Sequence, residues 1–453
     1  MSPSTPMSPS TPMIPWTPDE QPPVPGGHRF SRRRFLAGAG GLMGAAAVAG
    51  VGGYWLEGHL ASHGVTVGST ASASDGPILV VLTLYGGNDG LNTVIPYEDP
   101  AYASARGPMA VDPSTVLALR DGFGLHPSLA QFHGLWQQGR LAVVHGVGYP
   151  DPNLSHFASM DIWQSASPDG SQPTGWLGRW LDATGEDPLR ALAIGPTLPL
   201  ELSGAKVQGG AVPPPPLQLP GTPAFQQALT ALGASAPPVP ALQGDVAASG
   251  DDLMLLVRQL GPLFDGSGSA SPAGGTNLEG GAGGLAIDQG GGGRADGGVL
   301  TDQLDMIGTM IKAKVPTKAF AVSFGGFDTH AGQLATQKAL LAELDAAVPA
   351  FLAFLAGNER PVVVVIHTEF GRRVVANASG GTDHGAANVV LVAGHSVKGG
   401  FYGDAPSLTK LDDNGNLQYS TDFRSVYATV LDQAVGVDPG SVLDGRFPTL
   451  AFL

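Results

Sequence analysis

Five short runs of apolar residues recur along this chain, and each is bounded by glycine or by a group of polar residues. The runs cover residues 78–84, 141–144, 320–324, 361–366 and 389–393. They are rich in valine, isoleucine and leucine and show little polar alternation. That pattern is typical of parallel strands that are buried on both faces. We therefore predict a strand for each of the five runs.

Between these runs, apolar residues recur at spacings of three and four. Such sets cover residues 129–136, 300–311 and 341–355. The spacing predicts helices that each bury one face. Strand, helix and strand in succession indicate right-handed parallel crossovers. The predicted fold is an α/β protein, a three-layer α/β/α sandwich with a mainly parallel sheet.

The N-terminal residues 1–75 depart from this pattern. Residues 1–12 consist of the hexapeptide Met-Ser-Pro-Ser-Thr-Pro repeated twice. Arg32 and Arg33 lie in a basic group before a glycine- and alanine-rich stretch. A pair of arginines before a mildly apolar stretch is typical of a twin-arginine export signal. We predict a disordered N-terminus with a signal peptide, read by the twin-arginine translocation machinery. The protein is then periplasmic or extracellular, and it is membrane-anchored only if this leader stays uncleaved.

Residues 265–298 are dominated by glycine, serine and alanine, which predicts a disordered insertion. Residues 76–453 are then one domain that carries this insertion. Outside the leader, no stretch approaches the roughly 20 apolar residues that a membrane-spanning helix needs.

Charge and cysteine content narrow the chemistry. The net charge is −15 without a basic stripe, which argues against nucleic acid as a partner. The chain has no cysteine, so thiolate metal sites and cysteine nucleophiles are excluded. Freedom from disulfides also suits a protein that folds in the cytoplasm before export.

Residues that bind metals gather at the ends of the predicted strands. They are Asp89 after the first run, Asp328 and His330 after the third, Glu369 after the fourth, and Asp383 and His384 just ahead of the fifth. Ligand sites in open α/β sheets lie beyond the carboxyl ends of the strands. Carboxylate and imidazole together suit zinc or a similar divalent ion. We predict one or two divalent metal ions, zinc first, with manganese, calcium or magnesium as alternatives.

Several of these residues have a structural alternative. Asp89 could cap the following helix instead of binding a metal. Asp328 and His330 could form a turn that leaves the histidine on the surface. Glu369 could form a salt bridge with a neighbouring arginine; if it binds metal, Arg372 could hold an anionic substrate oxygen in bidentate fashion.

Ser155 and His156 stand before a predicted helix. A serine at a helix N-terminus is usually a cap. Beside a metal ion the same serine becomes a nucleophile, and the helix amides could hold an oxyanion. We predict that His156 and Asn88 contact the substrate.

Five motifs follow one another within residues 79–402: Gly-Gly-Asn-Asp-Gly-Leu-Asn, Leu-Ser-His-Phe, Gly-Gly-Phe-Asp-Thr-His, Thr-Glu-Phe-Gly-Arg and Gly-Thr-Asp-His-Gly. In this order they resemble the DUF1501 family of bacterial exported proteins. The twin-arginine leader is also typical of that family. The family resembles a branch of the alkaline phosphatase and sulfatase superfamily, whose members use two divalent metals to hydrolyse phosphate or sulfate esters. The resemblance implies an alkaline-phosphatase-like fold and an exported metal-dependent hydrolase of a small-molecule or polymer ester.

The resemblance also implies roles for single residues. Asp328 and His330 would bind the first metal, and His384, with Asp383 beside it, would close that site. Asp89 would bind the second metal, and Glu369 would take the place of the second-metal Asp-His pair. Ser155 would be the nucleophile. Phe370 stands where a histidine is usual, which weakens the second metal position. The sulfatase pattern Cys/Ser-x-Pro-x-Arg is missing from the chain. The alternative function is a non-catalytic exported protein that keeps this fold to bind a ligand or partner.

Overall fold

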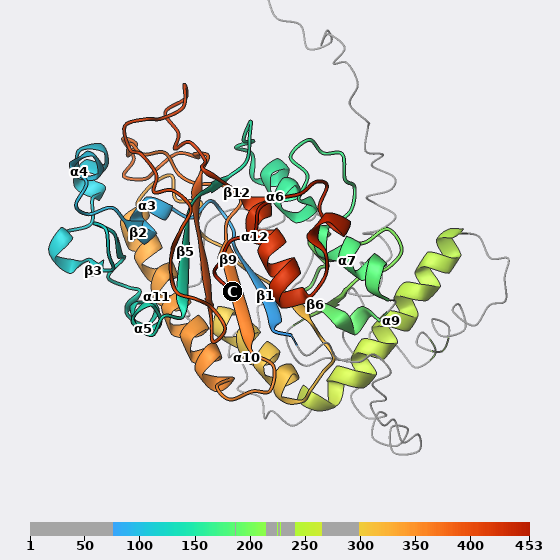
Figure 1. Cartoon of the computed structure of the whole chain (residues 1–453). Helices are drawn as coiled ribbons and strands as arrows, with labels where there is room; N and C mark the ends of the chain where they lie inside the picture. The colour runs from blue at the N-terminus through green and yellow to red at the C-terminus, as the bar shows by residue number, and fades with distance from the viewer. Residues whose placement is uncertain (1–75, 186, 214–223, 225–226, 228–240, 265–298) are drawn as a thin grey trace, which may run out of the picture.

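The computed structural model describes the chain from residue 76 to 453, apart from 186, 214–223, 225–226, 228–240 and 265–298 (Figure 1). The predicted export signal with Arg32 and Arg33, and the predicted insertion, lie outside the described residues. Within the part of the chain that is described, no helix is both long enough and apolar enough to cross a membrane.

A nine-stranded sheet forms the middle layer. Its strands are β1 (Ile78–Leu84), β5 (Leu141–Gly148), β6 (Ala191–Ile194), β7 (Gly210–Val212), β8 (Ala319–Phe324), β9 (Val362–His367), β10 (Asn388–Gly394), β11 (Gly400–Tyr402) and β12 (Thr421–Asp422). Their order is β11-β5-β10-β9-β1-β8-β6-β7, with β12 paired to β5. Only β10 runs antiparallel to its neighbours in this sheet. The predicted mainly parallel sheet is confirmed.

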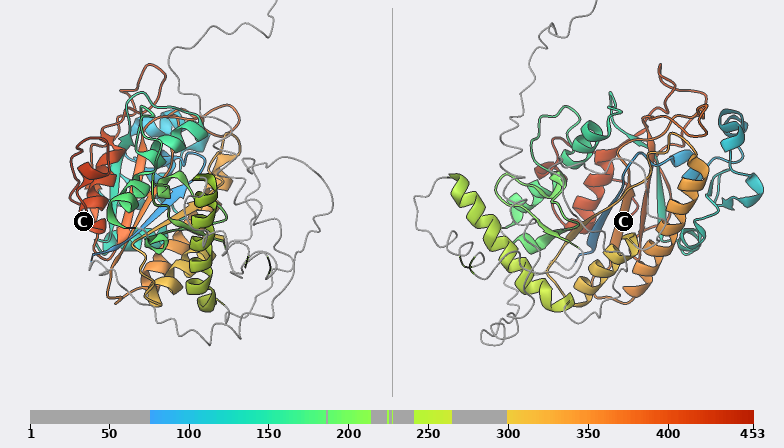
Figure 2. Two further views of the ribbon diagram at one scale, coloured as in Figure 1. Left: turned by 90° about the vertical axis from the view of Figure 1, so that its right-hand side faces the viewer. Right: turned by 180° about the vertical axis from the view of Figure 1, so that it is seen from behind.

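Helices cover both faces of the sheet, as Figure 2 shows in its left view. One face carries α5 (Ala130–Gln137), α9 (Ala241–Phe264), α10 (Val299–Lys312) and α11 (Gln333–Phe354), and the other carries α6 (His156–Ser165), α7 (Trp176–Thr184) and α12 (Phe423–Val430). Successive strand residues point to opposite faces, so Val80 and Leu82 lie in the first core while Leu79 and Val81 lie in the second. The predicted three-layer α/β/α sandwich is confirmed.

Short elements lie at the edges of this sandwich. An antiparallel sheet has the order β2 (Val94–Ile95), β4 (Gly124–Leu125) and β3 (Leu117–Ala118). The short helices are α3 (Gly90–Thr93), α4 (Pro100–Arg106), the 3-10 turns Gly107–Met109, Pro113–Thr115, Pro188–Arg190, Leu200–Leu202 and Pro439–Ser441, and the π-helix Leu431–Val435. A third, smaller core lies under α3 and α4 and includes Leu91 and Tyr102.

All five predicted strands and the three predicted helices are confirmed, with small shifts at their ends. The largest shift is in α11, which begins at Gln333 rather than near Leu341. Its first two turns bury Gln333 and Gln337 in hydrogen bonds to the Asn88–Asp89 turn. Because Gln333 and Gln337 are polar, the apolar spacing that predicts a helix begins only after these first turns.

The sheet brings the predicted site segments to one edge. β1, β8 and β9 are parallel neighbours, so the loops after them leave the sheet side by side. Because β10 runs antiparallel to β9, its beginning lies at that same edge. This direction explains why Asp383 and His384 precede their strand whereas Asp328 and Glu369 follow theirs.

Candidate metal centre

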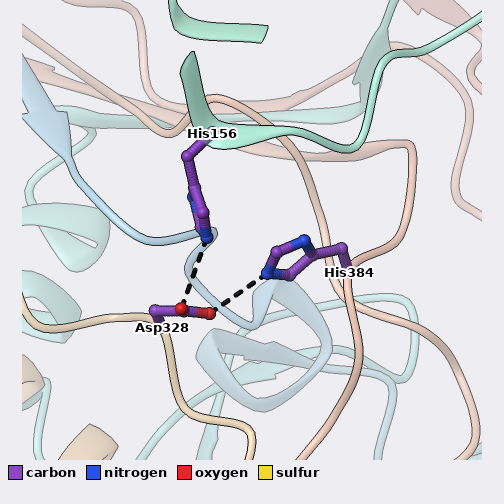
Figure 3. A group of neighbouring side chains, drawn as sticks. All are labelled: His156, Asp328 and His384. Atoms are coloured by element: carbon purple, nitrogen blue, oxygen red, sulfur yellow. Dashed lines mark hydrogen bonds and ion pairs between the residues drawn. The ribbon is translucent and has the colours of Figure 1, made fainter. Parts of the chain in front are cut away.

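His156, Asp328 and His384 form a group that could hold a metal ion (Figure 3). One ligand atom of each lies within 4.8 Å of the others. His156 is the first residue of α6, Asp328 lies in the loop after β8, and His384 lies in the loop before β10. Figure 3 shows both imidazoles pointing at the Asp328 carboxylate, with His384 Nε2 3.1 Å from Oδ1 and His156 Nε2 3.4 Å from Oδ2.

His330 joins this group from beside Asp328. Its Nε2 lies 3.1 Å from Asp328 Oδ1 and 2.9 Å from His384 Nε2. Three imidazole Nε2 atoms therefore converge on one carboxylate.

The opposite ring nitrogen of each of these histidines faces an acceptor. The Nδ1 atoms lie 2.7 Å from Glu369 Oε1 for His156, 3.1 Å from Asp383 Oδ1 for His330, and 2.8 Å from the Leu154 carbonyl oxygen for His384. From these partners we assign the proton of the neutral His156 and His384 rings to Nδ1, which leaves their Nε2 lone pairs directed into the group. The 2.9 Å hydrogen bond between His330 Nε2 and His384 Nε2 then takes its proton from His330. Histidine ligands of metals are oriented by outer acceptors in this way.

Most of the converging atoms are acceptors. The carboxylate oxygens and the Nε2 lone pairs of His156 and His384 all accept, and His156 Nε2 is buried without a hydrogen-bond partner among the described residues. Burial lowers the pKa of His384, which favours its neutral form. The hydrogen bond to Glu369 raises the pKa of His156, and the charge of Asp328 on the other side of the ring adds to this effect. A ring between two carboxylates attracts a cation, either a proton or a metal ion. Imidazole and carboxylate donors of this kind fit zinc or a similar divalent ion.

Arg372 holds Asp328 in place. Burial alone would raise the pKa of Asp328, but the hydrogen bond and positive charge of Arg372, with the neighbouring His384 and His156 rings, hold it at about 2. The Arg372 Nη2 atom lies 2.7 Å from Asp328 Oδ1, and its other nitrogens donate to carbonyl oxygens of Gly87 and Thr382, each at 2.7 Å. The predicted role of Arg372, holding a substrate oxygen, is not what this geometry supports, because its side chain is completely buried and its donors are used.

Glu369 lies behind His156 and not among the converging atoms. Its side chain is completely buried, and its Oε1 accepts hydrogen bonds from His156 and from the Gly86 amide at 2.9 Å. Burial works to raise the pKa of Glu369, but these hydrogen bonds hold it below its ordinary value. Asp383 is exposed, but its Oδ1 likewise faces the Nδ1 atom of a histidine, His330, at 3.1 Å. The structure thus places both predicted ligands as acceptors that orient a histidine.

Asp89 and Asn88 have other partners. The Asp89 carboxylate is buried, pairs with Arg106 through two bonds of 2.6 and 2.7 Å, and caps α3 by accepting from the Leu91 amide. Asn88 is also buried and donates to Thr93 Oγ1 at 3.0 Å. The helix-cap alternative for Asp89 is therefore the one that the structure shows. The predicted roles in metal binding and substrate contact do not fit these positions.

Ser155 stands at the N-terminus of α6, next to His156. Its side chain is exposed and forms no capping hydrogen bond. Its backbone amide donates to Asn153 Oδ1 at 2.9 Å. The Ser155 hydroxyl, which has no hydrogen-bond partner among the described residues, therefore lies one residue before His156.

The later part of the chain matches a known family. Residues 306–446 match the model of DUF1501, described as a protein of unknown function. The resemblance to DUF1501 is confirmed there. This DUF1501 segment contains Asp328, His330, Glu369, Asp383 and His384, whereas Ser155 and His156 lie before it.

Solved structures of low similarity also match. The C-terminal periplasmic domain of EcEptC from Escherichia coli, in complex with Zn, is 9% identical with a TM-score of 0.34, covering 82% of this chain and 81% of that one. The lipoteichoic acid synthase LtaP from Listeria monocytogenes is 11% identical with a TM-score of 0.35, covering 84% and 78%. The soluble domain of lipooligosaccharide phosphoethanolamine transferase A from Neisseria meningitidis is 9% identical with a TM-score of 0.34, covering 84% and 96%. At these scores the likeness does not extend to site or substrate, and no curated protein matches in sequence.

Two features of the candidate metal centre were not predicted from the sequence. The Leu154 carbonyl that orients His384 is a backbone atom, so no residue type announces it. Arg373 is half-buried near Asp383, and its Nε is buried without a hydrogen-bond partner in the part of the chain that the structure describes. Nothing in the sequence separates Arg373 from Arg372, yet only Arg372 is fully engaged with the backbone.

His145, part of the polar group after the second apolar run, lies away from the converging histidines. It sits inside β5, its ring centroid is 4.8 Å from those of Phe123 and Phe401, and neither ring nitrogen has a partner among the described residues. Burial lowers the pKa of His145 to about 4. It is a neutral core residue at ordinary pH.

Proposed function

We propose that this protein is an exported, metal-dependent hydrolase of phosphate or sulfate esters. The observation that supports it is the convergence of three imidazole Nε2 atoms on the Asp328 carboxylate. His156, Asp328 and His384, with His330 beside them, would hold a divalent ion, zinc first. When bound, such an ion lowers the pKa of a nearby hydroxyl or water and offsets negative charge on the ester oxygens.

Ser155 is the nucleophile in this proposal. Its exposed hydroxyl is free of structural hydrogen bonds and lies at the N-terminus of a ten-residue helix. That end of a helix carries partial positive charge, which favours the anionic oxygens of a phosphate or sulfate group. A water molecule that attacks in place of Ser155 is the alternative. A Ser155→Ala variant distinguishes them, because it abolishes turnover only if the serine attacks.

Other residues keep the reacting groups in position. Glu369, Asp383 and the Leu154 carbonyl hold the three rings with Nε2 directed inward. Arg372 holds the Asp328 carboxylate, whose pKa of about 2 keeps it charged over the ordinary pH range. Arg373 replaces Arg372 as the candidate cation for a substrate oxygen, because its guanidinium is not tied to the backbone.

The second candidate is a binding protein without turnover. The described residues bring one metal group together and not two, because Asp89 pairs with Arg106 and Glu369 lies behind His156. A clamp of two metals, which phosphatases use on both oxygens of the reaction, is therefore not available from the predicted ligands. A single ion could still bind an anionic ligand without hydrolysing it.

Metal analysis and turnover test both candidates. We expect about one ion per chain after exhaustive dialysis, and hydrolysis of p-nitrophenyl phosphate or sulfate by the loaded protein. His384→Ala should lose both, whereas His133→Ala, which changes a histidine outside the group, should keep both. An ion without turnover of any ester supports the binding protein. A folded protein that takes up no ion contradicts the hydrolase and favours a binding protein that needs no metal.

Export through the twin-arginine pathway completes the proposal. It rests on Arg32, Arg33 and the apolar stretch that follows them. Replacing both arginines with lysine should keep the protein in the cytoplasm, measured by cell fractionation. Export of the double variant would contradict this part of the proposal.

A further inference from the structure

A cavity of about 210 Å³ lies at the carboxyl ends of β1, β6 and β8. Its polar lining comes from Thr83, Tyr85, Gln164, Thr197, Glu201 and Ser323. The volume is below the range of about 300–1,000 Å³ that is usual for drug-sized ligands, so the cavity suits a small molecule. It contains none of the four residues that converge on the metal centre.

Glu201 is the unusual member of this lining. It belongs to the short helix Leu200–Leu202 and only 4% of its surface is exposed. Its carboxyl group has no hydrogen bond or ion pair with any other described residue. A buried acid is normally paired, because burial without a partner is costly. Here burial raises the pKa of Glu201 to about 8.

The described surroundings of Glu201 lack a cation that would pair with it. Among the residues that the structure describes, no lysine, arginine or histidine lines the cavity. Burial, together with negative charge on Glu369, Glu201 and Asp161, raises the pKa of Tyr85. Glu201 likewise adds to the effect of burial that raises the pKa of Tyr427. Both tyrosines therefore stay neutral, and Glu201 is the one group in the described lining that can carry charge near neutral pH.

We propose that this cavity binds a small organic cation, a primary ammonium group on a short carbon chain, with Glu201 as its counter-ion. The apolar lining from Ala193, Ile194, Ala321 and Val322 surrounds the carbon chain. Hydroxyl oxygens of Thr197 and Ser323 offer further acceptors for the ammonium protons. The ring of Tyr85 adds a cation–π surface.

The cavity adjoins the metal centre through two segments. Tyr85 precedes Gly86, whose amide donates to the Glu369 carboxylate that orients His156. Gln164 lies eight residues after His156 on α6, roughly 12 Å along the helix axis. An ammonium ligand could therefore be one end of a substrate whose ester reaches the centre, but binding in the cavity does not depend on the proposed hydrolysis.

The test is calorimetric titration of the full-length protein with propylammonium chloride, and with 1-propanol as the uncharged probe of equal length. At pH 9, above the pKa of Glu201, we expect propylammonium to bind and 1-propanol to bind at least tenfold more weakly. Glu201→Gln keeps the shape and removes the charge, so its affinity for propylammonium should fall at least tenfold. Equal binding of the two probes by the unaltered protein would overturn the proposal without any variant. Unchanged affinity in a folded Glu201→Gln protein would overturn it too.

Two further measurements separate this cavity from the metal centre. The His384→Ala protein should bind propylammonium as the unaltered protein does, because the cavity lining is untouched. Loss of binding in that variant would place the amine on a metal ion and overturn the proposal. The affinity for propylammonium should also rise as pH increases through 8, because Glu201 must lose its proton to bind the cation. Other titratable groups do not explain such a rise. Tyr85 and Tyr427 stay neutral, and Asp161 and Glu369 lie outside the cavity lining. Constant affinity from pH 6 to 9 would contradict the role of Glu201.

Discussion

Asp89 and Asp328 follow neighbouring parallel strands, and both carry a carboxylate to the same edge of the sheet. Asp89 is buried and receives two bonds from Arg106, a third from Gln333 and the amides at the start of α3. The Asp328 side chain is 41% exposed and receives one bond from Arg372. Its remaining neighbours are histidines.

The comparison shows which carboxylate can bind a ligand. Every acceptor of Asp89 has a donor from the protein, so this residue ties α3, α4 and α11 together. Asp328 is held by one arginine, while the Nε2 atoms of three imidazole rings face its oxygens. A ligand can bind at Asp328 because acceptor atoms near the surface there lack donors from the described protein.

Four predictions test this difference between the paired and the open carboxylate, from the largest expected effect to the smallest.

Replacing Asp328 should remove function and spare the fold. Asp328→Asn keeps the shape and its contact with Arg372 but loses the charge on which the imidazoles converge. We expect loss of the bound ion and a fall in kcat/KM of at least about 10³-fold, or about 4 kcal/mol. Elemental analysis and ester hydrolysis measure the two effects. A variant that hydrolyses as the unaltered protein does would refute the assignment.

Replacing Arg106 should do the reverse. Arg106→Ala leaves the Asp89 charge buried without its main partner, which typically costs 3–5 kcal/mol. We expect about 3 kcal/mol, because Gln333 and the amides of α3 still contact the carboxylate. Urea unfolding measures this free energy, and metal content per folded chain should not change.

The matched control restores charge balance in this cluster. A double variant, Asp89→Asn with Arg106→Met, removes both charges and should regain part of the lost stability. A single Arg106→Ala variant as stable as the unaltered protein would mean that the cluster is not structural.

Glu369 should affect metal binding only through His156. Glu369→Gln keeps one acceptor oxygen for the His156 ring and removes the charge. Loss of such an outer partner typically costs 10–100-fold in metal affinity or activity. We expect a loss of that size, clearly smaller than for Asp328→Asn, in competitive zinc titrations. An equal loss in the two variants would show that Glu369 binds the ion directly.

His145 should make the fold sensitive to acid without affecting the site. Its pKa is about 4 in the folded chain, because of burial, against about 6.5 when exposed. The unfolded chain therefore binds more protons between these values, and stability falls as pH is lowered from about 6.5 to 4. His145→Leu should reduce that fall by about 2 kcal/mol, measured by urea unfolding at pH 7 and pH 4. An identical pH dependence in the variant would contradict a buried neutral histidine.

Much of the fold was predictable because strands and helices are local patterns. Uninterrupted apolar runs predicted β1, β8, β9 and β10 nearly to the residue. The prediction fell short at the start of α11, where Gln333 and Gln337 are buried by hydrogen bonds rather than by apolar contacts. Hydropathy carries no record of such bonds.

The residue types of the site were also predictable, but their roles were not. Asp328, His330 and His384 come together as their strand-end positions implied, with Asp383 beside them. His156 was predicted to contact the substrate, yet its Nε2 points at Asp328. Its role depends on Glu369, 213 residues away in sequence, and no local pattern reports that contact.

The sequence by itself determined the layers, the sheet edge and the inventory of side chains available there, because periodicity and strand order act over short stretches. Tertiary structure alone decided that the Asp89 carboxylate is paired with an arginine and buried, and that the Asp328 carboxylate is partly exposed among histidines. Arg106 lies 17 residues from Asp89, and Arg372 lies 44 residues from Asp328. Tertiary structure likewise left Glu201 buried without a partner among the described residues. Pairing depends on distances between side chains from separate elements, and packing sets those distances.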